Sequence, residues 1–220
     1  VNKASEYVKH LYNTILGREP DEHGWEFWTA RINNKKSTPA DEIRLFTEST
    51  EFMNKGYSDE EFIDIAYAAF CGREPSEDEK TYRLSMLADG FTRSYILSRL
   101  SESDEYAAMC SEYGIHGGEV ALNGWQKNDE GTFYYRNGQK VRNEIKNIDG
   151  YTYYFDENGH AVNGWQTIDE NTYYFNDYHM VSGETVIDSK WYNFGEDGIF
   201  YTGWKTVDGK KQNFSSMRNT

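Results

Sequence analysis

One short aromatic pattern recurs through the C-terminal half of the chain and limits what that half can fold into. Its clearest copy runs from Asn163 to Asn176, where Asn-Gly-Trp-Gln-Thr is followed by Asn-Thr-Tyr-Tyr-Phe-Asn. Versions of it return about every 20 residues between Asn123 and Phe214. Because an isolated two-stranded hairpin is marginally stable in water, successive copies must stack to bury their apolar faces. The period therefore predicts a β-hairpin solenoid.

The alternation of side chains along each aromatic strand predicts which residues face the interior. Asn-Gly and Asp-Gly pairs such as Asp149-Gly150 separate the strands and favour tight hairpin turns. Aligning the copies predicts one continuous interior row, made of Tyr134, Tyr153, Tyr173, Tyr192, Phe155, Phe175, Phe194 and Phe214. The opposite face then carries Phe133, Tyr154, Tyr174 and Trp191.

The N-terminal half has a different period. Apolar residues from Val8 to Leu16, and again from Ile63 to Cys71, follow the spacing of one face of a helix. Both stripes end at Gly-Arg-Glu-Pro, in which Gly suits a left-handed C-cap and Pro blocks continuation. The sequence therefore predicts a multidomain α + β chain. An all-α tandem-unit domain, with helical units over residues 1–57 and 58–116, precedes the β-hairpin solenoid over residues 117–220.

Four residues of the helical half have alternative structural and functional interpretations. Arg18 and Arg73 follow helix C-termini, where an arginine binds free carbonyls or a nearby glutamate, and we interpret both as structural. Trp25 and Trp28 lie on different faces of one predicted helix. We expect Trp28 to pack between helices and Trp25 to be an exposed contact.

Charge and composition exclude several classes of function. The formal net charge is −14, and neither half has a basic face, which argues against nucleic acid and anionic membranes as partners. No stretch of 18 or more apolar residues occurs, so we expect no membrane insertion. The chain lacks an initial Met and a signal peptide, and we interpret it as a fragment of a longer protein.

The sequence contains no recognisable catalytic or metal-binding motif. Carboxylates are plentiful, but their spacing isolates no acid/base pair, and nucleophile and P-loop motifs do not occur. We therefore expect no catalysis, no cofactor and no metal site in this fragment, a prediction that leaves open a larger enzyme as its parent protein. Cys71 and Cys110 have no neighbouring His ligand. They are either two small buried residues or, as we expect, a disulfide of an extracellular protein.

The helical half resembles a helical family of unknown function that occurs, often duplicated, in secreted and surface bacterial proteins. The matching residues include Leu16-Gly17-Arg18-Glu19-Pro20, Phe27-Trp28 and the segment Ser49 to Phe52. The second unit departs from the pattern, because Glu79 and Arg83 replace Gly24 and Trp28. A pocket lined by Trp28 therefore need not be duplicated, and the family supplies no activity.

The hairpin half is similar to the cell-wall-binding repeats of Gram-positive bacteria, which include choline-binding modules, glucan-binding repeats and the C-termini of clostridial toxins. The similarity rests on Gly-Trp-Gln, Tyr-Tyr-Phe and Asn-Gly elements in five copies. It implies stacked hairpins with ligand sites between successive repeats. In choline-binding relatives three aromatic rings surround a quaternary ammonium group through cation–π attraction.

Transferring these positions to the sequence leaves one complete cage, formed by Trp125, Phe133 and Tyr154. The other sets each lack a ring: Glu144, Thr152 and Tyr174; Trp165, Thr172 and Asn193; Glu184, Trp191 and Asn213. Gln126 and Gln166 are candidates for hydrogen bonds to sugar hydroxyls. The candidate ligand-binding residues are Trp125, Phe133, Tyr154, Trp165, Tyr174, Trp191 and Trp204. The alternative for each Trp is that it only joins one hairpin to the next.

Three hypotheses of function follow. The leading one is a non-catalytic attachment region of a secreted or surface bacterial protein, whose repeats bind a cell-wall polysaccharide or an environmental glycan such as glucan. The second is a choline-binding anchor to phosphocholine-bearing teichoic acid. The third is a structural spacer whose helical units contact a protein partner.

Overall fold

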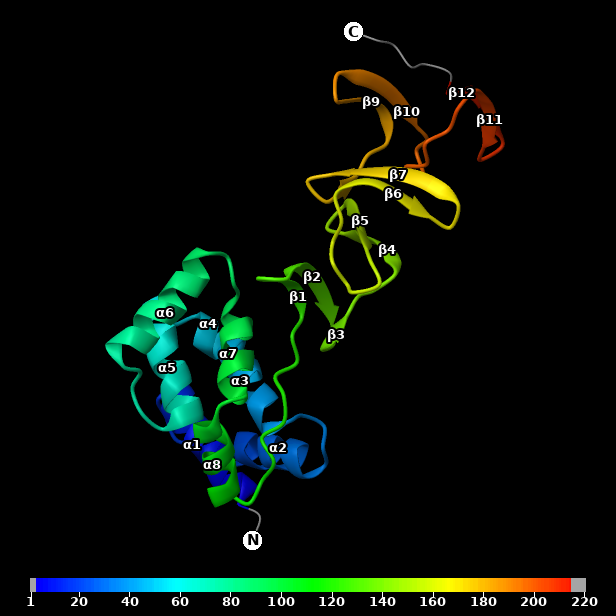
Figure 1. The fold of residues 1–220 in the computed structure, drawn as a ribbon. Coiled ribbons are helices and arrows are strands. Elements are labelled where there is room, and N and C mark those ends of the chain that lie inside the picture. The colour runs from blue at the N-terminus through cyan, green and yellow to red at the C-terminus, as the bar shows by residue number, and fades with distance from the viewer. Residues whose placement is uncertain (1–2, 215–220) are drawn as a thin grey trace. The chain divides into compact units, whose positions relative to one another are not determined.

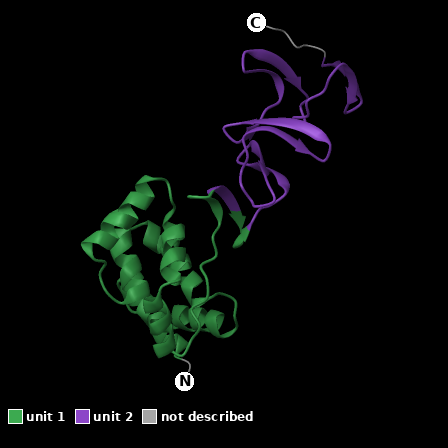
Figure 2. Ribbon diagram, in the orientation of Figure 1, with its two compact units in different colours: residues 1–130, 135–139 green, residues 131–134, 140–220 purple. Residues whose placement is uncertain are grey.

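The computed structural model describes residues 3–214 and divides the chain into two compact units (Figures 1 and 2). The first unit comprises residues 1–130 and 135–139, and the second comprises residues 131–134 and 140–220. The division therefore lies within the first hairpin, whereas the sequence suggested a boundary after residue 116. An α-helical region followed by β-hairpins agrees with the predicted fold class.

The helical part of the first unit repeats one arrangement of helices twice. The first copy contains α1 (Ala4–Leu11), the π-helix η1 (Tyr12–Leu16), α2 (Glu22–Asn33), α3 (Pro39–Thr47) and α4 (Thr50–Met53). The second contains α5 (Asp59–Cys71), α6 (Glu77–Ala88), α7 (Arg93–Ser101) and α8 (Asp104–Glu112). Gly17 and Gly72 end the first long helix of each copy in the left-handed conformation, as predicted. Ser58 and Ser76 form capping boxes with Glu61 and Glu79.

The two copies share a single hydrophobic core, so they are not separate domains. The Tyr7 hydroxyl, from α1, bonds the Pro39 carbonyl and the Tyr106 hydroxyl of α8, each at 2.8 Å. All three groups are buried, and the hydrogen bonds remove the cost of burying the two hydroxyls. Trp28 packs on Phe46 with ring centroids 5.0 Å apart, as expected for a residue between helices. Trp25 is half-buried, and its indole N–H donates to the Ser5 carbonyl.

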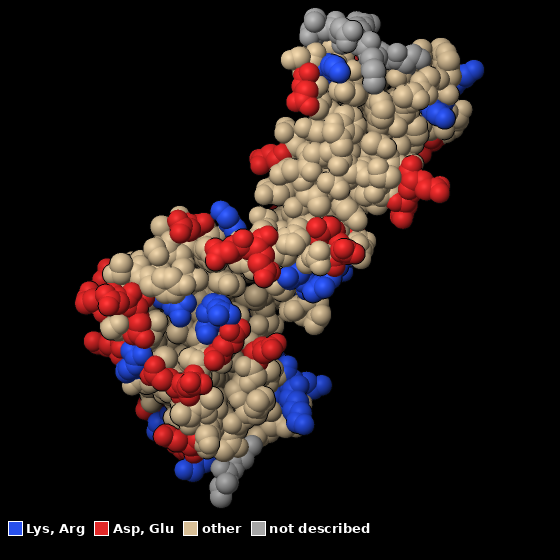
Figure 3. All heavy atoms as spheres, viewed as in Figure 1, with Lys and Arg blue, Asp and Glu red and all other residues tan. Residues whose placement is uncertain are grey.

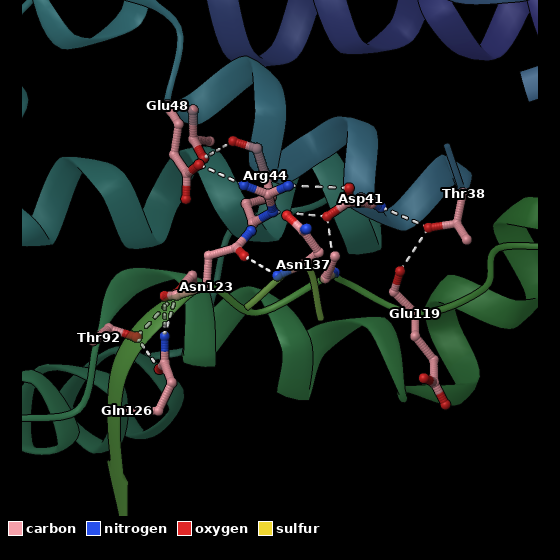
Figure 4. A network of polar contacts seen from close by, with 12 residues as sticks. Thr38, Asp41, Arg44, Glu48, Thr92, Glu119, Asn123, Gln126 and Asn137 are labelled. Atoms are coloured by element: carbon pink, nitrogen blue, oxygen red, sulfur yellow. Dashed lines mark hydrogen bonds and ion pairs between the residues drawn. The ribbon is translucent and has the colours of Figure 1, made fainter. Parts of the chain in front are cut away.

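The segment that follows α8 is bound to the helices, which explains why the first unit extends beyond residue 116. Thr38 Oγ1 donates to the Glu119 carbonyl at 2.6 Å, and Ala121 N donates to Asp41 Oδ1 at 2.8 Å (Figure 4). Asp41 is in turn held by Arg44 at 2.7 Å. These contacts attach the start of the repeat region to α3.

Five hairpins follow. Their strands are β1 (Gly124–Asn128), β2 (Gly131–Arg136) and β3 (Gln139–Lys140); β4 (Glu144–Ile148) and β5 (Tyr151–Phe155); β6 (Gly164–Ile168), β7 (Asn171–Asn176) and β8 (His179–Met180); β9 (Gly183–Ile187) and β10 (Lys190–Phe194); β11 (Trp204–Val207) and β12 (Lys210–Asn213). The pairs β4–β5, β6–β7, β9–β10 and β11–β12 are antiparallel, as the sequence predicted for hairpins. Three-stranded and two-stranded sheets alternate over the first four hairpins, so the true structural repeat is a pair of hairpins.

Backbone hydrogen bonds join the two hairpins of each pair. Ala161 N, after the second hairpin, donates to the Thr132 carbonyl at 2.8 Å. Phe200 N, after the fourth, donates to the Thr172 carbonyl at 2.7 Å. The residue that follows an even hairpin therefore returns to the aromatic strand of the hairpin before it.

The interior row differs from the predicted one at the first hairpin. Tyr153, Tyr173 and the four phenylalanines Phe155, Phe175, Phe194 and Phe214 are buried, as expected. Phe133, however, is 1% exposed and occupies the position assigned to Tyr134, which is only half-buried. The first copy was aligned one residue out of register, and a slip of one residue exchanges the two faces of a strand.

The predicted disulfide is not formed, because Cys71 and Cys110 are both free thiols. The two sulfurs have different surroundings. Cys110 lies against Tyr106 and next to Gly117. Near Cys71, the residue of α8 that approaches the following Gly72 is Met109 and not Cys110. Burial raises the pKa of the Cys71 thiol to about 11 and also raises the pKa of Cys110. Both therefore behave as small apolar residues, the alternative interpretation of these cysteines.

The hairpin turns give a first testable prediction. Asp149-Gly150 and Asp188-Ser189 both form turns with two positive φ angles, and Ser189 at +63° is strained where Gly150 at +88° is not. Gly150→Ala should lower the free energy of unfolding of the repeat unit by about 1 kcal/mol, whereas Ser189→Gly should raise it by up to about 1 kcal/mol. Thermal unfolding followed by circular dichroism measures both changes. A Ser189→Gly variant less stable than Gly150→Ala would contradict this assignment.

A second prediction concerns Glu42 of α3, which is fully buried and accepts a hydrogen bond from Ser37. Burial raises the pKa of this carboxyl from 4.5 to about 8. Since the folded protein retains a proton that the unfolded chain releases, the free energy of unfolding should fall as the pH rises from about 4.5 to about 8, by up to about 1.4 kcal/mol per pH unit. Glu42→Gln, which keeps the acceptor, should flatten this slope. Urea unfolding at several pH values checks it, and equal slopes in both proteins would refute it.

Candidate ligand-binding site

Four aromatic side chains of the second unit surround Trp165. The Trp165 ring lies 5.1 Å from Tyr174 and 5.1 Å from Tyr192, and 5.8 Å from both Phe194 and Phe200, between centroids. Trp165 itself is 40% exposed. Tyr174, Tyr192 and Phe200 are half-buried, whereas Phe194 belongs to the core. The cluster therefore presents aromatic surface to solvent with a rigid base beneath it.

The register of the strands brings these rings together. Trp165 of β6 pairs directly with Tyr174 of β7, so the two rings lie on one face of the third hairpin. Tyr192 comes from β10 of the fourth hairpin, and the bridge between Phe194 and Phe200 holds the chain that follows it. The site thus lies between two successive hairpins, where the resemblance placed the ligand sites.

The predicted cage of Trp125, Phe133 and Tyr154 is not supported, because Phe133 is almost completely buried. The Lys140 ammonium lies 4.0 Å from the centre of the Phe133 ring, and the His160 ring lies 4.9 Å from it. The Lys140 ammonium of the protein itself therefore lies over the ring on which the prediction placed a ligand cation. Trp125 lies in the first unit, and Tyr154 lies in the second, 6.4 Å from Phe175.

The remaining predicted residues differ in their surroundings. Tyr174 contacts Trp165, as described above. Trp191 is half-buried, and none of the ring contacts around Trp165 involves it. Trp204 is 63% exposed, with the Lys211 ammonium 5.5 Å from its ring. A ligand role for Trp191 or Trp204 stays a prediction.

Tyr192 and Phe200 were not among the predicted site residues. Tyr192 was assigned to the interior, which its partial burial and its contact with Trp165 show to be only half correct. Phe200 follows the fourth hairpin, and both its bridge to Phe194 and the hydrogen bond from its backbone N–H to the Thr172 carbonyl bring it to the site. Ile145, and not Glu144, occupies the register position of Trp165 in the second hairpin, since Ile145 pairs with Tyr154 as Trp165 pairs with Tyr174.

The two glutamines proposed to bind sugars have different environments. Gln126 is buried, accepting a hydrogen bond from Thr92 Oγ1 at 2.6 Å and donating to Ser94 and Asn123 at 3.2 Å (Figure 4). It therefore attaches the first hairpin to α7 and is not available to a sugar. Gln166 keeps the equivalent bond to the Asn163 carbonyl at 3.1 Å and is half-buried.

Charge is distributed unevenly over the surface. On the face shown in Figure 3, acidic and basic groups crowd the helical unit, whereas the repeat unit is largely uncharged. Burial raises the pKa values of Tyr153 and Tyr173, in keeping with their place in the core. Among residues 3–214, no group of three or more His, Cys, Asp or Glu side chains is arranged to hold a metal ion. No helix in this part of the chain is long and apolar enough to cross a membrane.

Comparison with protein families separates the same two regions. Residues 162–199 match the choline-binding repeat family, and residues 146–161 match a cell wall binding repeat family. These matches agree with the resemblance of the hairpins to cell-wall-binding repeats. Residues 2–56 and 43–110 match the family described as Domain of unknown function (DUF4214), in agreement with the duplicated helices. No curated protein matches the chain.

Several solved structures are similar to part of the chain. Choline-binding protein F from Streptococcus pneumoniae is 31% identical, with a TM-score of 0.37, over 44% of this chain and 33% of that one. The Cpl-1 endolysin, solved with a peptidoglycan analogue, is 26% identical, with a TM-score of 0.34, over 41% and 29%. A truncated alternansucrase from Leuconostoc mesenteroides is 24% identical, with a TM-score of 0.31, over 41% and 9%. The matches thus cover a third or less of these solved chains.

The opposite environments of Phe133 and Trp204 give a third prediction. Phe133→Ala should lower the free energy of unfolding of the repeat unit by about 3–5 kcal/mol, because it opens a cavity in the core. Trp204→Ala should change it by no more than about 0.5 kcal/mol, because the ring is largely solvated. Chemical denaturation of the full chain measures both. If both truncations cost equally little, Phe133 would not be a core residue.

Proposed function

We propose that this chain is a non-catalytic wall-attachment region of a secreted or surface bacterial protein, and that the Trp165 cluster binds the quaternary ammonium group of choline. The supporting observation is the partly exposed Trp165 ring, flanked by Tyr174, Tyr192 and Phe200 between two choline-binding repeats. On this proposal the partner is a phosphocholine-bearing wall polymer.

Cation–π attraction is the interaction that such a site supplies. A cation close to an aromatic face gains about 0.5–2 kcal/mol, depending on how far it is desolvated. The rings here contact one another and leave one partly open surface, so we expect weak binding by a single site. A net charge of −14 adds a long-range attraction for the cation and repels a bare anionic polymer.

A second candidate function is glycan binding, the leading hypothesis from the sequence. The observation that favours it is the flat ring of Trp204, 63% exposed on the first strand of the last hairpin. Exposed indole rings stack on the apolar faces of sugars without any charge on the ligand. On this alternative Trp204 and Trp165 are separate stacking platforms.

Titration with choline chloride, followed by tryptophan fluorescence, tests the first proposal. We expect saturation with a dissociation constant of about 1–50 mM, in keeping with one cation–π site. The neutral isostere 3,3-dimethylbutan-1-ol should bind at least about fivefold more weakly, because it lacks the charge. Trp165→Ala should abolish the saturable signal, and Trp204→Ala should retain it.

Two outcomes would contradict the choline site. One is an unchanged response in Trp165→Ala, and the other is equal binding of choline and its neutral isostere. Retardation in gels loaded with dextran, starch or purified cell walls distinguishes glycan binding from choline binding. Loss of that retardation in Trp204→Ala, but not in Trp165→Ala, would favour the second candidate.

A further inference from the structure

The duplicated helical domain offers an internal comparison at two equivalent arginines. Arg73 follows α5, and all five of its N–H groups are used. Its Nε and Nη2 bond the two carboxylate oxygens of Glu105 at 2.8 and 2.7 Å. Its Nη1 and Nη2 bond both oxygens of Glu79 at 2.8 and 2.9 Å, and Nη1 also donates to the Glu74 carbonyl. The guanidinium is saturated by two carboxylates, one on each of two edges.

Arg18, the equivalent residue of the first copy, has only one of these two carboxylates. Its Nε and Nη2 bond Glu51 at 2.7 and 2.9 Å, as Arg73 bonds Glu105, and Nη1 donates to the Glu19 carbonyl. Within residues 3–214, no acceptor forms a hydrogen bond with the second N–H of either Nη atom. These two groups form the edge that Glu79 occupies on Arg73. The nearest carboxylate oxygen on that side is Asp21 Oδ2, 3.7 Å from Nη1.

The sequence difference that opens this edge is a glycine. Gly24 stands where the second copy has Glu79, and a side chain there would collide with the Tyr12 hydroxyl. Trp28 stands where the second copy has Arg83, which bonds the Tyr67 hydroxyl at 3.4 Å. The first copy therefore supplies aromatic surface where the second supplies charged side chains.

A small cavity of about 110 Å³ is lined in part by Arg18. Its lining includes the rings of Tyr12, Trp28 and Phe46 together with Ser49 and Glu51. The guanidinium carbon lies 4.9 Å from the centre of the Tyr12 ring, and the bidentate bond to Glu51 fixes its plane. The donors are thus held in place before any ligand arrives, which reduces the entropy cost of binding.

We propose that the open edge of Arg18 binds the carboxylate of a ligand, which takes the place that the Glu79 side chain fills in the second copy. A planar carboxylate matches two parallel N–H groups of a guanidinium, and Glu79 shows this match inside the same domain. Hydrogen bonds from Arg73 lower the pKa of Glu79 to about 2, which shows how strongly the edge favours an anion. An acidic side chain, a peptide C-terminus or an acidic sugar supplies such a carboxylate.

Asp21 limits the affinity of this site, because its carboxylate lies near the same edge. It also caps α2 by accepting a hydrogen bond from Gly24 N at 2.9 Å. Asparagine caps a helix as well as aspartate does and carries no charge. Asp21→Asn therefore preserves the helix and removes the one internal competitor.

Nuclear magnetic resonance of the arginine side chains in the full chain tests the proposal. Sodium acetate is titrated against sodium chloride at constant ionic strength. We expect a saturable shift of the Arg18 signals and none of the Arg73 signals, which serve as an internal control. Asp21→Asn should bind acetate at least about threefold more tightly, because it removes the repulsion by a nearby like charge. N-acetylglycine and galacturonate then distinguish a peptide from an acidic sugar as the source of the carboxylate.

A variant of the second copy provides the matched control. Glu79→Ala opens the same edge on Arg73 and should create a second acetate site that wild type lacks. Circular dichroism checks that each variant is folded. The proposal is overturned if acetate moves Arg18 no more than chloride does, if Arg18 and Arg73 respond alike in wild type, or if Asp21→Asn leaves the affinity unchanged. None of these readings depends on choline, so the repeats and this site are tested separately.

Discussion

Stacking of aromatic rings between hairpins holds the repeat unit together, and its other properties follow from that. Strands of two to six residues offer few aliphatic side chains, so Phe155, Phe175 and Phe194 supply much of the core. The bonds from Ala161 to Thr132 and from Phe200 to Thr172 hold the hairpins at a spacing that keeps these rings in contact. A ligand site in such a core is made from rings that stacking leaves partly uncovered, as at Trp165.

In the helical domain, the two copies of a duplicated arrangement differ in whether a carboxylate covers one edge of an arginine. Both copies hold their inter-helix loop through an arginine paired with a glutamate, Arg18 with Glu51 and Arg73 with Glu105. The second copy adds Glu79 and closes the remaining edge of its arginine. The first copy keeps Gly24 there, so an otherwise structural arginine retains two donors. The site proposed in the helical domain is therefore a place where one copy lacks a group that the other copy supplies.

For the repeat unit, the sequence predicted which strands carry the Trp165 cluster better than it predicted which side chains contact Trp165. The period located the hairpins, and the Gly-Trp pair located Trp165 and Trp204 on first strands. Assigning Phe133 to the exposed face failed because the first copy has Tyr135 at the position where the other copies have Phe155, Phe175, Phe194 and Phe214. A shift of one residue then exchanged its two faces. Phe200 was not predicted, because it lies after the strands of the fourth hairpin, and its bridge to Phe194 and its hydrogen bond to Thr172 bring it to the site.

Residues that are close in sequence determined the local structure of this protein. Capping boxes, glycine C-caps, turn dipeptides and both periodicities determined a duplicated helical domain followed by stacked hairpins, because each depends on residues within one turn or one hairpin of each other. Only the tertiary structure decided that the helical copies share one core, that Gln126 binds Thr92, and that Lys140 covers Phe133. Those contacts join residues whose separation no local pattern records, and small differences in packing decide them.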